Sequence, residues 1–376
     1  MHLVFLSDNM NFSGGRKLLF EYASFLRKRG HKVDVLVQKE KGSLKGTLSV
    51  TIVNAFNRDE IPECDLIIAT TPREVKNAYD SKRGDVIHFC QGYEITDLNQ
   101  RVNGKVIPPR YQSKSLFSKF TILRKKLSWR KKIKRIDNIY RLPTVLLTVS
   151  KHLQKELELI YSRKVFLCEN GIHNEYFYPQ KDFHWNKFTP EKPLKIINIG
   201  PHKVTFKGIN TTLKAIEILK KKNFPIMLIR VAPHIEQHEY DNPIIDKCYE
   251  NIPPENLGEL LRNSHVYISN STEGEGFGLP ALEAISSGLI TILSSINSYK
   301  NFSNKKNFCY FIPEYDALKT AETIEKILTL PKNEIEKMRT SALSVAKKFS
   351  FKHSCETFEK ILYKNLHKEK QVKKRK

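Results

Sequence analysis

Residues 2–37 read HLVFLSDNMNFSGGRKLLFEYASFLRKRGHKVDVLV, and this stretch decides the fold class. Its first six residues are an apolar strand, and NFSGG at 11–15 is a turn. Apolar residues then recur at helical spacing from Leu18 to Leu26, Gly30 ends the helix, and 33–37 is a second strand. A strand, a crossover helix and a second strand form a βαβ unit. Its usual setting is a parallel sheet covered by helices on both faces.

The same pattern continues along the chain and then restarts in the second half. Further strands are predicted at 66–69, 86–90, 145–149 and 165–168, with a helix at 151–161. The second half predicts strands at 195–199, 226–230, 266–269 and 290–293, helices at 209–221 and 280–287, and helical segments on both sides of Asn263. A proline-containing stretch without periodicity separates the two halves. We therefore expect two doubly wound α/β domains at 1–178 and 194–350, a linker at 179–193, and a C-terminal helix with a basic tail at 351–376.

The composition predicts a folded protein without a metal cluster or a disulfide framework. The chain has 376 residues, of which 40% are hydrophobic and 10% aromatic, so it can build sizeable cores. Its six cysteines are far apart and form no Cys-x-x-Cys motif, so neither a zinc site nor a set of disulfides is indicated. No apolar run approaches the ~20 residues that cross a bilayer. The N-terminus lacks a basic region before its apolar run, so we expect a cytoplasmic protein.

The excess positive charge lies in two segments. Residues 101–141 hold fourteen Lys and Arg and one acid, and residues 364–376 hold seven and one, so these segments carry +13 and +6 of the net +24. Three interpretations remain open: a solvated loop with a solvated tail, an anionic membrane surface, or nucleic acid. No nucleic-acid reading motif accompanies the charge, so we expect no nucleic-acid partner. Basic clusters gain ~1 kcal/mol per residue near anionic lipid.

Residues 269–283 read SNSTEGEGFGLPALE and carry the chemistry. They follow a strand and open a helix, with Pro280 near its first position. The glycines at 274, 276 and 278 let the backbone approach a ligand, and the helix N-terminus favours an anion. Glu275 and Glu283 stand eight residues apart in the same element, and Glu283 can accept hydrogen bonds from a vicinal diol. This pattern predicts a binding loop for a molecule that carries both an anion and hydroxyl groups.

Several segments together resemble one enzyme family. The loop is similar to the Glu-x7-Glu element of retaining glycosyltransferases of the GT-B fold, in the group classed as family four. Gly200 with Lys207-Gly208 resembles the family's phosphate motif. Segments 149–151, 169–173 and 176–179 (VSK, ENGIH and YFYP) resemble the end of its first domain. The resemblance implies two Rossmann-like domains facing a central cleft, the first binding the acceptor and the second the nucleotide sugar, with a C-terminal helix that crosses back to the first.

The resemblance also implies roles for individual residues. Glu275 contacts the donor sugar near C3, Lys207 neutralises the leaving diphosphate, and Glu283 holds the ribose hydroxyls. Further donor contacts are implied for the backbone of Phe277, Gly278 and Leu279, and for Gly200 and Gly15. The chain contains no Asp-x-Asp motif. We therefore expect no metal and no cofactor, with a nucleotide-diphosphate sugar as the substrate.

Two segments depart from the family pattern. The family has an arginine a few residues before the Lys-Gly, whereas this chain offers only Lys203 or His202 as substitutes. Many members also have a histidine after a first-domain strand, but His88 lies inside the predicted strand and is interpreted as structural. Gln91 and Glu94, at the carboxyl end of that strand, are instead the candidates for acceptor or sugar binding.

The resulting prediction is a metal-independent, retaining, hexosyltransferase-like enzyme. It moves a sugar to a saccharide or a lipid-linked saccharide, and the family suggests bacterial envelope polysaccharide synthesis. The alternatives are a sugar-nucleotide epimerase or phosphorylase of the same fold, or a basic nucleic-acid-binding protein. The expected location is cytoplasmic, peripheral at the inner face of the plasma membrane if the basic segment binds lipid.

Overall fold

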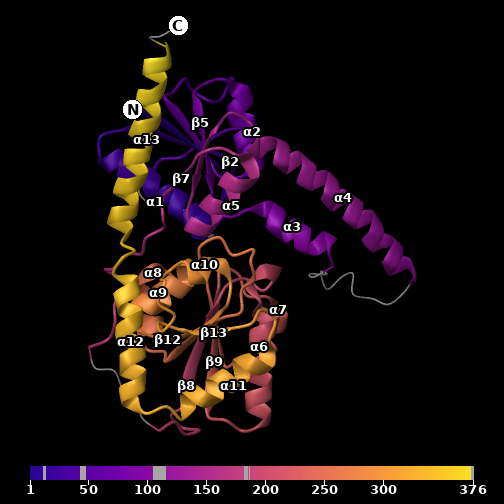
Figure 1. Cartoon of the computed structure of the whole chain (residues 1–376), viewed down its shortest axis with the longest axis vertical. Helices are drawn as coiled ribbons and strands as arrows, with labels where there is room; N and C mark the ends of the chain where they lie inside the picture. Colours follow the sequence, from indigo (N-terminus) through magenta and orange to yellow (C-terminus); the bar gives the residue numbers. More distant parts are fainter. Residues whose placement is uncertain (12–13, 43–47, 105–115, 182–184, 186, 374–376) are drawn as a thin grey trace. The chain divides into compact units, whose positions relative to one another are not determined.

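The structure is a computed structural model, and it describes residues 1–11, 14–42, 48–104, 116–181, 185 and 187–373 (Figure 1). The chain divides into two compact units. Unit 1 comprises Met1–Glu169 and Lys352–Lys376, and unit 2 comprises Asn170–Phe351. Segment 170–178 packs with unit 2, because Ile172 forms a β-bridge with Ser350 and Ser286 donates to the carbonyl of Phe177 over 2.7 Å.

Within the described residues, unit 1 contains a seven-stranded sheet in the order β3-β2-β1-β4-β5-β6-β7, and its pairs are parallel. The strands are β1 (His2–Met10), β2 (Lys32–Gly42), β3 (Thr51–Ile52), β4 (Leu66–Ala69), β5 (Asp85–Cys90), β6 (Val145–Thr148) and β7 (Val165–Leu167). The connecting helices are α1 (Gly14–Lys28), α2 (Pro72–Ser81), α3 (Glu94–Val102), α4 (Leu116–Tyr140) and α5 (Lys151–Tyr161). The first βαβ unit thus forms as the sequence predicts.

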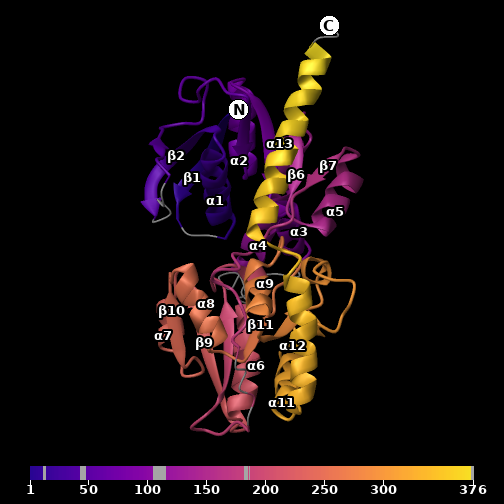
Figure 2. The ribbon, with the colours of Figure 1, turned by 90° about the vertical axis from the view of Figure 1, so that its left-hand side faces the viewer.

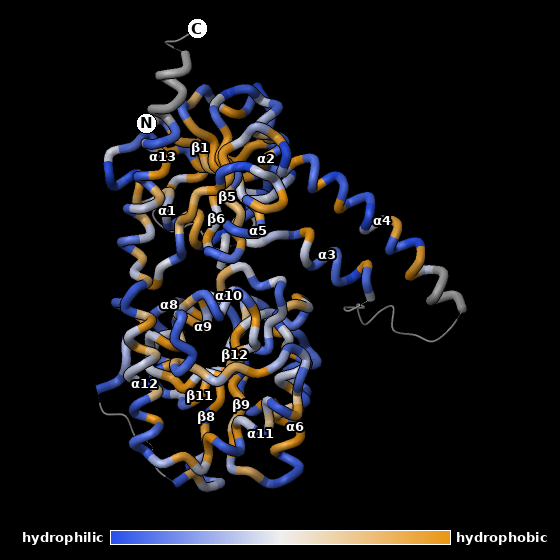
Figure 3. Tube along the Cα trace, in the orientation of Figure 1, coloured by the Kyte–Doolittle hydropathy of each residue, from blue (hydrophilic) through white to orange (hydrophobic). Residues whose placement is uncertain are grey.

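Helices cover both faces of this sheet (Figure 2). Val86 on β5 belongs to a core that includes Val75 of α2 and Ile139 of α4. Side chains alternate along a strand, so Phe89 lies on the opposite face, where its ring is 5.9 Å from that of Tyr22 on α1. Strands of such a sheet are buried on both faces and are therefore hydrophobic along most of their length. Figure 3 shows this hydropathy in orange.

The C-terminal helix α13 (Phe351–Lys373) returns to unit 1, which confirms the predicted crossing. The ring of Tyr22 stacks on that of Phe358 with centroids 4.6 Å apart, and its hydroxyl lies 2.5 Å from Ser354 Oγ. The buried imidazole of His31 contacts Glu359 at 2.9 Å. These contacts attach α13 to α1 and to the turn before β2.

In the part of unit 2 that the structure describes, six strands form a second parallel sheet in the order β10-β9-β8-β11-β12-β13. The strands are β8 (Leu194–Ile199), β9 (Ile226–Ala232), β10 (Lys247–Glu250), β11 (Val266–Ser269), β12 (Ile290–Ser294) and β13 (Tyr310–Ile312). The helices are α6 (Ile209–Lys221), α7 (Gln237–Tyr240), α8 (Pro254–Arg262), α9 (Leu279–Ser286), α10 (Asn297–Lys300), α11 (Ala317–Leu328) and α12 (Lys332–Ala346), with a short 3₁₀ turn η2 (Thr205–Lys207).

One predicted element of unit 2 is wrong. The helical segment expected after Asn263 does not form, because α8 ends at Arg262 and Asn263 closes it by donating to the carbonyl of Glu259 over 3.0 Å. Strand β11 starts at Val266, which leaves no space for another helix turn. The predicted strands and helices on either side of this point are present, with ends shifted by one or two residues.

Candidate functional site

At one residue, Gly278, the glycine-rich loop between β11 and α9 has a backbone conformation that only glycine adopts readily. Gly278 precedes the first residue of α9 with a φ of 92°, in the left-handed region. A Cβ atom there would lie 2.3 Å from Cε1 of the buried Tyr299. The first turn of α9 contains Pro280 and no acidic residue, so nothing in that turn offsets the positive end of the helix dipole.

A partly buried ion pair joins this loop to the loop after β8. Lys207 Nζ lies 2.5 Å from Glu275 Oε2, and the two side chains are 17% and 10% exposed. The backbones are joined as well, since the N–H of Thr272 donates to the carbonyl of Phe206 over 2.8 Å. Gly208 permits this close approach, because a Cβ atom there would lie 1.9 Å from the carbonyl oxygen of Asn270. The two residues predicted to be catalytic are therefore in direct contact.

A buried arginine, Arg230, holds the start of the loop after β8. Arg230 on β9 is fully buried and donates to the carbonyl of Gly200 over 2.7 Å and to Asn198 Oδ1 over 2.8 Å. Its charge is balanced by the equally buried Glu239, whose Oε1 lies 2.8 Å from Nη2. Arg230 thus fixes Gly200, which begins the loop that carries Lys207.

The other residues predicted to bind the donor lie on α9 and just before it. Phe277 is buried, and its ring packs against those of Phe302 and Phe349 with centroids 5.5 and 5.9 Å away. Leu279 and Glu283 are partly exposed. Burial raises the pKa of Tyr267 well above its usual value, and the negative charges of its neighbours, including Glu275 and Glu283, add to the shift.

Neither residue offered as a substitute for the family's arginine contacts the ion pair in this structure. Lys203 is largely exposed and pairs with Glu236 at 2.8 Å. The ring nitrogens of His202 lie 2.6 Å from His238 Nε2 and 2.6 Å from Asn210 Oδ1. His202 and Lys203 thus attach the loop after β8 to neighbouring elements, whereas Lys207 contacts Glu275.

Among the candidate residues of unit 1, Gln91 contacts Gly15 and Glu94 is held by Tyr140. Gln91 Nε2 donates to the carbonyl of Gly15 over 2.9 Å. Glu94 begins α3 and accepts a hydrogen bond of 2.8 Å from the hydroxyl of Tyr140. Burial raises the pKa of the Glu94 carboxyl above its usual value, while the hydrogen bonds it accepts oppose the shift. His88 is fully buried on β5, and burial lowers its pKa to about 3, so it is neutral, as expected of a structural residue.

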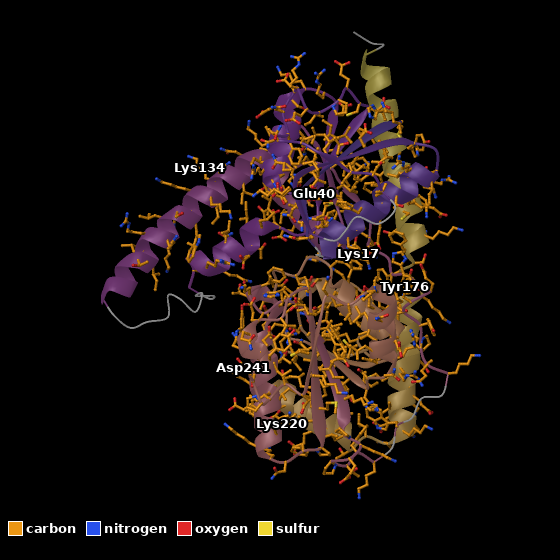
Figure 4. All side chains as sticks on the ribbon, turned by 180° about the vertical axis from the view of Figure 1, so that it is seen from behind. Lys17, Glu40, Lys134, Tyr176, Lys220 and Asp241 are labelled. Carbon is orange, nitrogen blue, oxygen red and sulfur yellow. The ribbon has the colours of Figure 1, made fainter. Side chains whose placement is uncertain are left out.

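The basic helix α4 extends from the body of unit 1 with α3 beside it (Figure 1). Its C-terminal end is anchored by the buried Ile136, Ile139 and Tyr140. Further along, Leu123 and Leu127 are 57% and 52% exposed. The basic residues exposed on α4, of which Lys134 is labelled in Figure 4, are Arg124, Lys125, Arg130, Lys131, Lys132, Lys134 and Arg135. Residues 105–115 and the side chains of 116–120 and 366–376 lie outside the described part of both basic segments.

Sequence reasoning missed two buried residues beneath the site, Arg230 and Tyr299. A charged residue inside the apolar run of β9 was a usable signal for Arg230, because an arginine is buried in a strand only with partners. Tyr299 offered no such signal, since it sits in a polar stretch of the sequence. Among the described residues there is no cluster of three or more potential metal ligands, and no helix is long and apolar enough to cross a membrane.

Comparisons with known proteins show what this chain resembles. Residues 179–344 match the family model of glycosyl transferases group 1. A GDP-mannose:cellobiosyl-diphosphopolyprenol alpha-mannosyltransferase of Xanthomonas oryzae pv. oryzae is 22% identical over 205 residues, which cover 52% of each chain. The match thus spans about half the length of this curated relative.

Solved structures match over almost the whole chain. Sucrose-phosphate synthase from Thermosynechococcus elongatus has a TM-score of 0.70 at 16% identity, covering 97% of this chain and 98% of that one. The Anabaena protein HepE in complex with UDP-glucose has a TM-score of 0.69 at 14% identity, covering 97% and 100%. With its two parallel sheets, the chain has the α/β architecture of GT-B glycosyltransferases, as predicted.

Proposed function

We propose that this chain is a retaining glycosyltransferase of family four that moves a sugar from a nucleotide-diphosphate donor without a metal ion. The observation that carries the proposal is the partly buried Lys207–Glu275 ion pair, beside which the N–H of Thr272 donates to the carbonyl of Phe206 and joins the two loops. The group 1 match over 179–344 covers both loops and supports this proposal. The names of two similar proteins contain GDP-mannose and UDP-glucose, which are both nucleotide-diphosphate sugars, and this supports a donor of that class.

The proposed chemistry uses fixed positive charge. When the bond between the anomeric carbon and the diphosphate oxygen breaks, positive charge develops on the sugar and negative charge on the leaving group. Lys207 and the N-terminus of α9 stabilise the departing anion, which is the role that a divalent cation has in other transferases. Glu275 contacts the donor sugar and Glu283 accepts hydrogen bonds from the ribose hydroxyls. The acceptor hydroxyl oxygen bonds to the anomeric carbon on the face that the diphosphate leaves, and the hydroxyl proton passes to the departing diphosphate oxygen.

We assign the acceptor to unit 1 and propose a saccharide that is lipid-linked, in bacterial envelope polysaccharide synthesis. The exposed basic residues of α4 and the exposed Leu123 and Leu127 support a helix that lies on an anionic membrane surface. Cations attract the lipid headgroups, and leucines enter the interface. The protein then acts at the cytoplasmic face of the membrane, where it meets a membrane-bound acceptor.

A donor screen tests the function directly. Thermal unfolding is measured with GDP-mannose, UDP-glucose and other sugar nucleotides, because a ligand that binds the native state raises the midpoint by mass action. The donor that stabilises the protein is then incubated with it in the presence of EDTA, and the anomer of the transferred or hydrolysed sugar is identified by NMR. Absence of stabilisation and turnover with every sugar nucleotide contradicts the proposal, and an inverted anomer contradicts retention.

A further inference from the structure

A chain of buried hydroxyl groups leads from Tyr299 to the carboxylate of Glu275. Tyr299 Oη lies 2.6 Å from Ser269 Oγ, and Ser269 Oγ lies 2.9 Å from Ser271 Oγ. Ser271 Oγ donates to Glu275 Oε2 over 3.5 Å, the longest of the three contacts. The four residues are between 0% and 8% exposed, so water does not compete for these bonds.

The direction of the hydrogen bonds follows from the chemistry of the last group. An ionised carboxylate only accepts, so the Ser271 hydroxyl donates to Glu275 and accepts from Ser269. Ser269 in turn accepts from Tyr299. The three hydroxyl dipoles therefore point toward the carboxylate and strengthen one another. Burial, with the charge of Glu275, raises the pKa of Tyr299, so the phenol keeps the proton that it donates.

The ring of Tyr299 contacts the other half of the site. A Cβ atom on Gly278 would lie only 2.3 Å from Cε1 of Tyr299. The ring therefore packs directly on the backbone that begins α9. Tyr299 itself is 1% exposed, on the short helix α10. One side chain thus touches the start of α9 and reaches Glu275 through two serines.

We propose that Tyr299 is a positioning residue of this site, whose hydroxyl orients Glu275 against Lys207 and whose ring holds the N-terminus of α9. The effect of Tyr299 on turnover rests on the proposed function, whereas its effect on the position of Glu275 does not. The contact between Lys207 and Glu275 defines the geometry that Tyr299 maintains, and Tyr299 does not itself reach the substrate.

Tyr299→Phe separates the hydroxyl from the ring. The variant keeps the packing on Gly278, so the affinity for GDP or UDP stays within about twofold in calorimetry. Turnover of the donor falls by up to about tenfold at unchanged KM, the effect expected from the loss of one buried hydrogen bond between neutral hydroxyls. Ser271→Ala interrupts the same chain at its other end and lowers turnover similarly. Ser294→Ala is the matched control, because its buried hydroxyl donates to the Ser269 carbonyl and not to the chain.

A double-mutant cycle tests the inference without any activity. Urea unfolding is measured for the wild type, Tyr299→Phe, Glu275→Gln and the double variant. We expect Tyr299→Phe to lower the midpoint less in the Glu275→Gln background, because the charged acceptor is gone. Ser294→Ala should show the same effect in both backgrounds. A zero coupling between Tyr299 and Glu275, or a loss of turnover no greater than that of Ser294→Ala, overturns the positioning role. If no sugar nucleotide is turned over, the proposed function fails, and the cycle still decides the role of Tyr299.

Discussion

The Nζ atom of Lys207 lies 2.5 Å from Glu275 Oε2, although 68 residues separate the two along the chain. Their loops leave the carboxyl ends of β8 and β11, which are neighbours in the sheet of unit 2. Ligands of α/β proteins bind at this edge of a parallel sheet. The ion pair balances the lysine charge and sets the position of both groups relative to each other, which the proposed function requires of them before a donor binds.

Glu283→Ala should weaken donor binding. The carboxylate is proposed to accept two ribose hydroxyls, and hydrogen bonds to a charged group contribute ~1.5–3 kcal/mol, or roughly ten- to hundredfold in Kd. Calorimetry with GDP-mannose and UDP-glucose measures the change. Equal affinity of wild type and variant would show that Glu283 has a structural role.

Glu275→Gln should leave nucleoside-diphosphate affinity nearly intact and lower turnover. The amide keeps the shape of the side chain, but the carboxylate charge next to Lys207 is lost. That charge is the one proposed to face the donor sugar. The two quantities are measured on the same preparation, by calorimetry with GDP or UDP and by release of the sugar. A collapse of diphosphate affinity would mean that the roles assigned to Glu275 and Glu283 are interchanged.

Gly278→Ala should destabilise unit 2 by at least ~2 kcal/mol, because a left-handed φ and a clash with the Tyr299 ring act together. The free energy of unfolding is measured in urea. Gly14→Ala is the control, since a Cβ atom at Gly14 meets no atom within 4 Å and the residue lies in α1. Its stability should be unchanged or slightly higher.

His88→Leu should reduce the loss of stability in mild acid. Burial, helped by the positive charge of Arg163, lowers the native pKa of His88 to about 3. In the unfolded chain a histidine binds a proton below about pH 6.5, whereas native His88 does not. The free energy of unfolding of the wild type therefore falls by ~1.4 kcal/mol for each pH unit between about 6.5 and 3.

The variant has no such proton to bind in the unfolded state. Urea unfolding at pH 7 and pH 5.5 should therefore show a drop smaller by ~1.4 kcal/mol in His88→Leu than in the wild type. Ile87→Val serves as the control, because it alters a buried side chain of the same strand that has no titratable group, and it should keep the wild-type drop. An identical drop in His88→Leu would show that the imidazole is protonated in the native protein.

Replacing five basic residues of α4 by Gln should release the protein from anionic vesicles and spare donor hydrolysis. Wild-type co-sedimentation should rise with the fraction of anionic lipid and fall with salt, since charges are screened over ~8 Å at physiological ionic strength. The five residues are Lys125, Lys126, Arg130, Lys131 and Lys132. The control replaces five exposed lysines of unit 2, namely Lys305, Lys306, Lys337, Lys347 and Lys348. Equal binding to neutral and anionic vesicles, or none, favours a soluble acceptor.

Local signals in the sequence were sufficient for much of the fold. The strand, turn and helix over 2–28 follow from apolar spacing and glycine placement, because both are set by nearest neighbours along the chain. The pattern of 266–286 likewise determined a strand, a glycine loop and a helix, with an error of one residue at each end of the helix. The two carboxylates of that loop were singled out by their spacing in the glycine loop, whereas the roles predicted for them came from its resemblance to the Glu-x7-Glu element.

Contacts between distant segments were decided only by the tertiary structure. Tyr299 reaches Glu275 through Ser269 and Ser271 because β12 and α10 fold back beside β11, and no local pattern encodes that approach. The partner of Gln91 is likewise a carbonyl 76 residues away, on Gly15. Sequence spacing therefore determined which residues are on the loops. The order of the strands in the sheet determined which of these residues meet, because hydrogen bonds and charges act over a few ångströms of space and not along the chain.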